Sequence, residues 1–150
     1  MMREILFRGK SIDTGQWAEG FLVVDTIVCE DAAPVKHYHI EEMTLGSYPD
    51  DFQSGISETV DPITVGQFTG LTDKNGKKIF EGDVVVCRQE INGNWIDYCV
   101  EIGYVEMKHG AFGLHRKQGY YRPFKDWHED YEYEVIGNIH DSPELMEGYR

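Results

Sequence analysis

Long apolar runs, paired cysteines and basic side chains are all scarce in this sequence. No segment approaches the ~20 consecutive apolar residues that a membrane-spanning helix requires, and the N-terminal residues lack the apolar run of a signal peptide. Cys29, Cys87 and Cys99 form an odd set without a Cys-x-x-Cys pair, which is atypical of a secreted disulfide framework. We therefore expect a cytoplasmic protein with reduced thiols and no membrane association.

Basic residues are few relative to acidic ones: 14 Lys and Arg stand against 27 Asp and Glu, for a formal net charge of −13. Acidic side chains exceed basic ones in both halves of the chain. Nucleic-acid phosphates are bound mainly through Lys and Arg, so we expect no general nucleic-acid binding. The charge favours solubility, and it leaves open an acidic surface that meets a basic partner or imitates DNA.

The common catalytic motifs are also absent. The sequence contains no phosphate-binding GxxxxGK(S/T) loop, no GxGxxG after a strand, no HExxH and no GxSxG nucleophile turn. A catalytic cysteine needs a base beside it, and the setting of Cys87 and Cys99 in expected strands indicates packed thiols instead. We predict a protein without catalytic activity and without a cofactor.

Two patterns resemble metal-binding sequences without completing them. Asp73, Asn75 and Gly76 look like the start of a calcium loop, but the sixth position from Asp73 is a lysine and the twelfth is a valine. This segment therefore predicts a tight turn. His37 and His39 share one face of an expected strand, but zinc needs three or four ligands and the spacing supplies no others. We predict no metal site.

What the sequence does contain favours β-strands. Aromatic residues make up 13% of the chain, and 16 Gly occur among frequent turn dipeptides. Turns are predicted at Asn92-Gly93-Asn94 and at Lys108-His109-Gly110. Hydrophobic patterns predict strands over residues 17–28, 35–40, 84–87, 98–107 and 132–139, with a short helix after Asp141. Residues 41–64 show little periodicity and are predicted to be a loop or linker.

The expected architecture is all-β, mainly β with a short C-terminal helix. Residues 1–64 are predicted to form an N-terminal β-hairpin unit that ends in the loop or linker. Residues 65–150 are predicted to form an SH3-like β-barrel that ends in the helix. The same pattern also fits one compact unit that contains both segments.

Five aromatic side chains are the candidate functional residues. They either cover the barrel or form an exposed patch of the kind that marks a protein interface. The five are Trp95, Tyr98, Tyr120, Tyr121 and Trp127.

Two other functions stay open beside protein–protein contact. A small β-barrel that binds nucleic acid could use the basic cluster of Arg116, Lys117, Arg122 and Lys125, although the net charge opposes this. A hydrolase could use the clustered carboxylates at residues 126–130, although neighbouring carboxylates in a loop more often form a solvated turn.

Four blocks, spread from one end of the chain to the other, read REILFRG at residues 3–9, QFTGLTDKNGKKIFEGDVV at 67–85, GAFGL at 110–114 and YEVIGNIH at 133–140. These blocks resemble the YopX family of phage and prophage proteins. The resemblance implies an all-β fold with an SH3-like barrel and a phage or prophage origin. It implies no activity, because the function of the family is unknown.

The residues and the resemblance together predict an accessory protein of a phage or prophage, located in the bacterial host cytoplasm. We expect it to be no enzyme and to act by contact with an unknown protein partner, either another protein or a second copy of itself. Neither composition nor motifs identify that partner.

Overall fold

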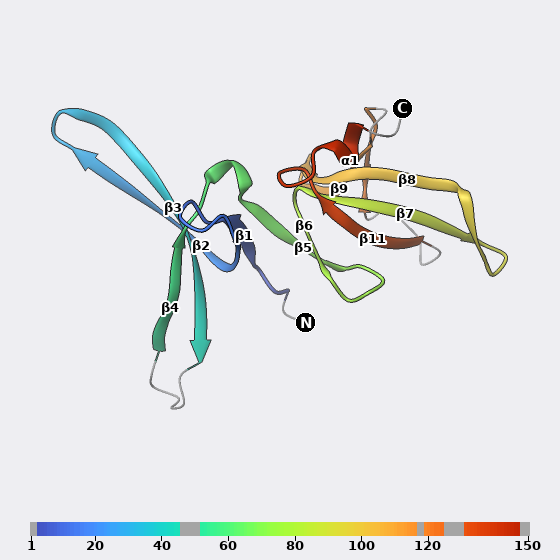
Figure 1. Cartoon of the computed structure of the whole chain (residues 1–150), viewed down its shortest axis with the longest axis horizontal. Coiled ribbons are helices and arrows are strands. Elements are labelled where there is room, and N and C mark those ends of the chain that lie inside the picture. Colours follow the sequence, from blue (N-terminus) through green and yellow to red (C-terminus); the bar gives the residue numbers. More distant parts are fainter. Residues whose placement is uncertain (1–2, 46–51, 117–118, 125–130, 148–150) are drawn as a thin grey trace. The chain divides into compact units, whose positions relative to one another are not determined.

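Antiparallel β-strands make up most of the chain, so the predicted all-β fold is confirmed (Figure 1). This computed structural model describes residues 3–45, 52–116, 119–124 and 131–147. The chain divides into two compact units, Met1–Gln67 and Phe68–Arg150. The sequence-based division at residue 64 stays a prediction about folding domains. Within the described ranges, no helix combines the length and apolar character needed to cross a bilayer.

The first unit is a sheet of long strands with a small core. Its elements are β1 (Phe7–Lys10), β2 (Trp17–Cys29), β3 (Ala32–Leu45), β4 (Phe52–Thr59), the 3-10 turn η1 (Pro62–Thr64) and the start of β5 (Gly66–Thr72). The strand order within it is β4-β3-β2-β1-β5. Ala18, Ile40 and Val60 are buried at its centre, and four partly buried side chains pack against them. These four are Phe7, Leu22, Tyr38 and Val65.

Both long strands of this unit change partners along their length. β2 pairs with β1 through Trp17–Gly20 and then with β3 from Phe21 onward. Likewise β3 pairs with β2 up to Glu41 and with β4 from His39 onward. A Cβ atom at Gly20 would collide with the Glu41 carbonyl oxygen, so the sequence needs glycine where β2 passes β3.

The prediction of a loop or linker at residues 41–64 is wrong for those residues of the segment that the structure describes. β3 continues to Leu45, β4 occupies Phe52–Thr59, and η1 follows with Asp61 as its cap. Residues 46–51 lie outside the described ranges. Pairing between β3 and β4 is set by contacts such as His39 opposite Thr59, and periodicity within the segment cannot reveal such pairing.

The second unit holds a five-stranded antiparallel sheet in the order β10-β9-β8-β7-β11 within its described residues. The strands of this sheet are β7 (Asp83–Ile91), β8 (Asn94–Lys108), β9 (Ala111–Arg116), β10 (Tyr121–Pro123) and β11 (Tyr131–Asn138). The remaining strand, β6 (Lys78–Phe80), pairs with β5. The predicted short C-terminal helix is present as α1 (Glu144–Glu147). The SH3-like character of this unit stays a prediction.

Two tight hairpins of this sheet follow directly from turn chemistry. Asn92-Gly93 joins β7 to β8, and His109-Gly110 joins β8 to β9. All four residues have positive φ angles, between 52° and 79°, as two-residue hairpin turns of type I′ require. Both turns were predicted from the sequence, and both are confirmed.

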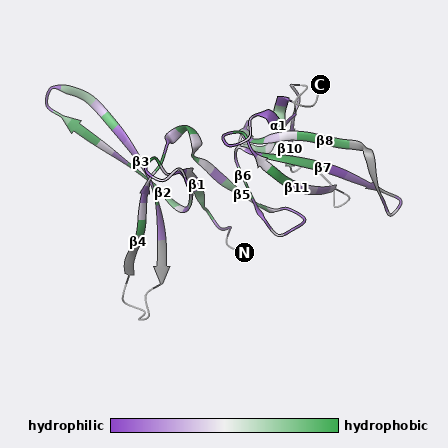
Figure 2. Cartoon of the chain, in the orientation of Figure 1, coloured by the Kyte–Doolittle hydropathy of each residue, from purple (hydrophilic) through white to green (hydrophobic). Residues whose placement is uncertain are grey.

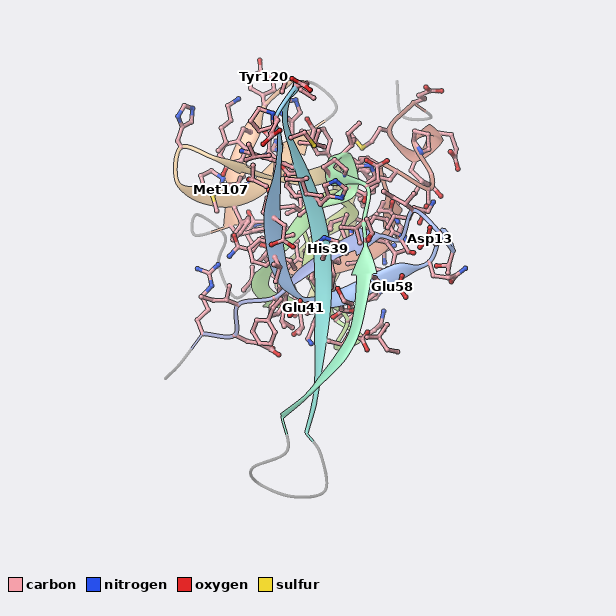
Figure 3. All side chains as sticks on the ribbon, turned by 90° about the vertical axis from the view of Figure 1, so that its left-hand side faces the viewer. Asp13, His39, Glu41, Glu58, Met107 and Tyr120 are labelled. Atoms are coloured by element: carbon pink, nitrogen blue, oxygen red, sulfur yellow. The ribbon has the colours of Figure 1, made fainter. Side chains whose placement is uncertain are left out.

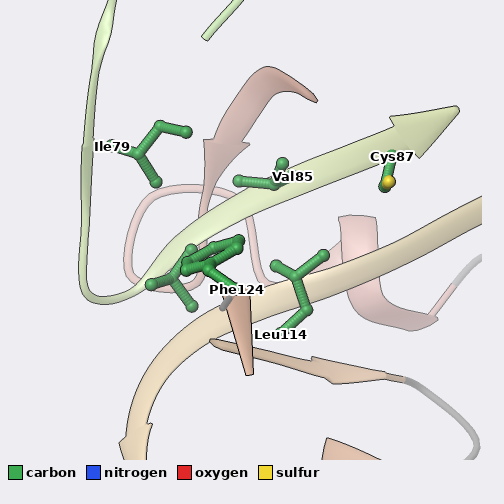
Figure 4. Packing of buried hydrophobic residues seen from close by; sticks show 6 residues of the cluster. Ile79, Val85, Cys87, Leu114 and Phe124 are labelled. Carbon is green, nitrogen blue, oxygen red and sulfur yellow. The ribbon is translucent and has the colours of Figure 1, made fainter. Parts of the chain in front are cut away.

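The core of the second unit lies on one face of this sheet (Figure 4). Burying each large aliphatic or aromatic side chain there stabilises the fold by about 1.5–3 kcal/mol. The buried cluster consists of Ile79, Val85, Cys87, Val105, Leu114 and Phe124.

Asp73 ties the predicted tight turn to the sheet. Its Oδ1 accepts hydrogen bonds from the backbone N–H of Asn75 at 2.8 Å and Lys77 at 2.9 Å, and Gly76 has φ +79°. Its Oδ2 accepts from the N–H of Val135 in β11 at 3.1 Å. Burial alone would raise the pKa of Asp73, but these three donors lower it below the usual value. The predicted turn is confirmed, and the carboxylate belongs to the scaffold.

Candidate interaction surface

The five aromatic residues predicted as an interaction patch are only partly described. Tyr120 is exposed, with 69% of its surface accessible, and Tyr121 is half-buried in β10. Trp95 and Tyr98 lie in β8, but their side chains fall outside the described part, and Trp127 lies outside the described residues. The patch as a whole therefore stays a prediction.

Tyr121 has a structural role that explains its partial burial. Its hydroxyl donates a hydrogen bond to the carbonyl oxygen of Ala111, where β9 begins. The ammonium of Lys108 lies 5.8 Å from the centre of its ring. Through these contacts Tyr121 connects β10 to the turn between β8 and β9. Its side chain therefore stabilises the packing of β10 against that turn.

A different surface emerges in the first unit, at the outer end of the β2–β3 hairpin. We define the outer ribbon as residues 21–29 of β2 and 32–37 of β3. Because β1 pairs only with residues 17–20 of β2, and β4 pairs with β3 from residue 39 onward, neither segment of the outer ribbon pairs with β1 or β4. Figure 1 shows this part of the hairpin extending past β1 and β4 within its unit.

Apolar side chains of the outer ribbon are exposed, and Figure 2 shows hydrophobic residues on both of its strands. Val28 at the tip is 75% accessible, and Ile27 and Val35 form a cross-strand pair on one face. An isolated two-stranded hairpin is only marginally stable in water, and clustered exposed apolar residues mark interaction sites. The exposed fractions are Phe21 47%, Val24 43%, Ile27 48%, Val28 75% and Val35 53%.

Polar residues near the base of the outer ribbon orient one another. Asp25 lies opposite His37, and its Oδ2 is 3.7 Å from Nε2 of His39 (Figure 3 labels His39 on β3). The two imidazole rings stack with centres 6.3 Å apart, and Nδ1 of His39 is 3.2 Å from the hydroxyl of Thr59. Thus the histidines share a face as predicted. In the described ranges, no three His, Cys, Asp or Glu residues gather as a metal site would require.

A second polar cluster lies on the core face of the five-stranded sheet. Arg116 and Glu101 form an ion pair of 2.8 Å, and the Arg122 guanidinium carbon lies 5.3 Å from the centre of the Tyr131 ring. Two members of the predicted basic cluster are therefore engaged within the protein. The other two, Lys117 and Lys125, and the clustered carboxylates at residues 126–130 lie outside the described residues.

The thiol of Cys87 is buried beside this cluster. Burial, followed by the negative charge of Glu101, raises the pKa of Cys87 to about 12. Burial likewise raises the pKa of the neighbouring Tyr133 phenol. A nucleophilic cysteine needs a lowered pKa, so both groups are packed as uncharged side chains at neutral pH.

The sequence predicted strands at residues 17–28 and 35–40 but gave no sign that their outer parts are exposed. A run such as Phe21-Leu22-Val23-Val24 also fits a buried strand. The one available signal lies in β3, where Pro34 and Lys36 are residues that protect exposed strand edges.

The comparisons with known proteins concern nearly the whole chain. A family model described as YopX protein matches residues 7–147. No curated protein matches the chain. Among solved structures, the crystal structure of protein EF1440 from Enterococcus faecalis is similar, with a TM-score of 0.52 and 24% sequence identity. The alignment covers 97% of this chain and 99% of EF1440. At this level of identity the likeness concerns the fold alone.

Proposed function

This chain belongs to the YopX family, and we propose that it is a non-enzymatic accessory protein of a phage or prophage that acts by contact with another protein molecule. The contact is made by the outer ribbon, in the cytoplasm of the bacterial host. The phage or prophage origin rests on the resemblance of the four sequence blocks to this family.

One observation carries the proposal: the outer ribbon exposes apolar side chains on segments of β2 and β3 that pair with neither β1 nor β4. Val28 and Val35, on the two strands of the hairpin, are more than half accessible. Covering such side chains gains about 25 cal/mol for each Å² of apolar surface removed from water. A protein partner would supply that cover and the strand or surface that a two-stranded ribbon lacks.

The chemistry of the described titratable groups supports a non-catalytic role. Asp73 is committed to three backbone N–H groups, and the raised pKa of Cys87 keeps it a thiol. His115 is engaged by Glu106 at 2.9 Å and stacks on Tyr104, with ring centres 5.0 Å apart. Each of these groups has a structural partner that accounts for its position.

Capture of partners from a bacterial host lysate tests the proposal, with bound proteins identified by mass spectrometry. The Val28→Asp/Val35→Asp variant places two charges on the outer ribbon. The matched control, Ile56→Asp/Ile63→Asp, places the same charges on side chains that are 67% and 80% accessible elsewhere in the unit. We expect the first variant to lose bound protein and the second to retain it.

Two results would contradict the proposal. One is a set of captured proteins that is not empty and is identical for both variants and the unmodified chain. The other is a chain that captures nothing and is also monomeric by light scattering.

A further inference from the structure

The two open edges of the outer ribbon differ in how well they can accept another strand. Exposed edges are normally protected from pairing by proline, lysine or other charges. The β3 edge carries Pro34 and Lys36, whereas residues 21–29 of β2 contain neither residue type and a single charge, Asp25. The unprotected edge is therefore that of β2.

We infer that the β2 edge of the outer ribbon pairs antiparallel with the same edge of a second copy of this chain, with Thr26 opposite Thr26 on the twofold axis. This inference rests on the proposed function, because it identifies the partner of the surface proposed there. The product is a four-stranded sheet in the order β3-β2-β2-β3. In it the backbone N–H and C=O groups along both β2 edges form hydrogen bonds.

The residue pattern of β2 fits this register. With Thr26 on the axis, Val24 of one copy lies opposite Val28 of the other, and the symmetry repeats that contact. These side chains are 43% and 75% accessible in the single chain, so the pairing covers the most exposed apolar residue of the ribbon. Asp25 lies opposite Ile27, so no two carboxylates face each other directly.

Registers shifted toward the base of the hairpin are less favourable. Moving the axis to Asp25 would place two carboxylates directly opposite, and such like-charge pairs are destabilising. Moving it to Val24 would bring Val28 opposite Gly20, where β2 already pairs with β1. The pattern of charge and strand pairing therefore favours the axis at Thr26 over the axes at Asp25 and Val24.

The response of the association to salt distinguishes self-pairing from binding of a basic partner. Each copy carries a formal net charge of −13, so salt screens the repulsion between copies and strengthens their association. Binding of a basic partner would respond in the opposite direction, because salt weakens attraction between opposite charges.

Sedimentation equilibrium of the full chain tests the inference, in low salt and in 0.5 M salt. We expect the mass of two chains, with tighter association at high salt. Thr26→Lys places two lysines opposite each other and should weaken self-association by about tenfold or more, which corresponds to about 1.4 kcal/mol. The matched control Ala33→Lys adds the same charge to β3, outside the paired edge, and should change association by less than about threefold.

A cross-linking measurement checks the register without adding charge. In a Cys29→Ser/Cys99→Ser background, Thr26→Cys should form a disulfide-linked dimer on mild oxidation, because directly opposite Cα atoms about 4.5–5.5 Å apart suit a disulfide. Ala33→Cys should not form one. Circular dichroism of each variant verifies that the fold is retained.

The inference is overturned by a one-chain mass at about 100 µM, a concentration at which even weak specific dimers form. It is equally overturned if Thr26→Lys leaves the dimer intact or if both cysteine variants cross-link alike. A monomer that still captures a host protein through the outer ribbon would remove self-pairing and leave the proposed function standing.

Discussion

At the scale of single residues, Asp73 connects a local turn to a distant strand. Its two carboxylate oxygens accept hydrogen bonds from Asn75, Lys77 and Val135. Replacing Asp73 with asparagine removes at least one of these charge-assisted bonds. We expect Asp73→Asn to lower the free energy of unfolding by about 1–3 kcal/mol at pH 7, as urea denaturation would measure. Asp13→Asn, in an exposed turn, is the control and should change it little.

The pH dependence of that effect follows from the lowered pKa of Asp73. The folded protein binds this proton more weakly than the unfolded chain does, so stability from Asp73 is fully present above the unfolded pKa of 3.8. It is lost as the pH falls from there through the lower folded pKa. The stability difference between the unmodified chain and Asp73→Asn should therefore shrink below pH 4. A difference that stays constant down to pH 2 would contradict the role of this carboxylate.

The two described thiols should differ sharply in reactivity. Cys29 is exposed, whereas burial raises the pKa of Cys87 to about 12, so almost none of it is thiolate at pH 8. Alkylation followed by peptide mapping should label Cys29 at once and Cys87 only after unfolding. Labelling of native Cys87 at a rate similar to that of Cys29 would contradict its assignment as a buried, uncharged thiol and would favour a nucleophilic role.

At the scale of elements, the passing point of β2 and β3 depends on Gly20. An added Cβ would collide with the Glu41 carbonyl oxygen, which belongs to the backbone and cannot turn away. We expect Gly20→Ala to lower the free energy of unfolding by about 1–3 kcal/mol, the usual cost of overpacking. Gln16→Ala, on an exposed residue before β2, is the control. An unchanged midpoint of chemical unfolding for Gly20→Ala would show that the strands do not pass so closely.

The elements also show what the sequence could and could not predict. Turns were predicted well, because Asn92-Gly93 and His109-Gly110 carry their conformation in their own residue types. β4 was missed, since its pairing with β3 depends on contacts such as Ile40 opposite Glu58 that local periodicity does not encode.

Exposure was the second failure of sequence reasoning. Val23-Val24 in the outer ribbon and Val84-Val85 in the core are similar dipeptides, yet Val24 is 43% accessible and Val85 is fully buried. What separates them is whether other side chains cover the strand, and this is a property of the tertiary fold. The candidate surface could therefore not be located from the sequence, and the predicted aromatic patch was placed in the other unit.

At the scale of the whole molecule, the net charge of −13 limits the choice of partners. Arg116 and Arg122, the described members of the basic cluster, are engaged with Glu101 and Tyr131. We expect no gel shift of single- or double-stranded nucleic acid by micromolar protein, even at low salt, where phosphate contacts are strongest. A salt-sensitive shift would show that a basic surface outside the described residues outweighs the overall charge.

The central claim is that the outer ribbon is the surface by which this chain meets another protein molecule, through the open edge of β2. Hydrogen–deuterium exchange of the full chain at low and high protein concentration tests it most directly. We predict slower amide exchange in residues 21–29 at high protein concentration than at low concentration. Exchange in residues 33–37 should be the same at both concentrations. Equal exchange of residues 21–29 at both concentrations would contradict it.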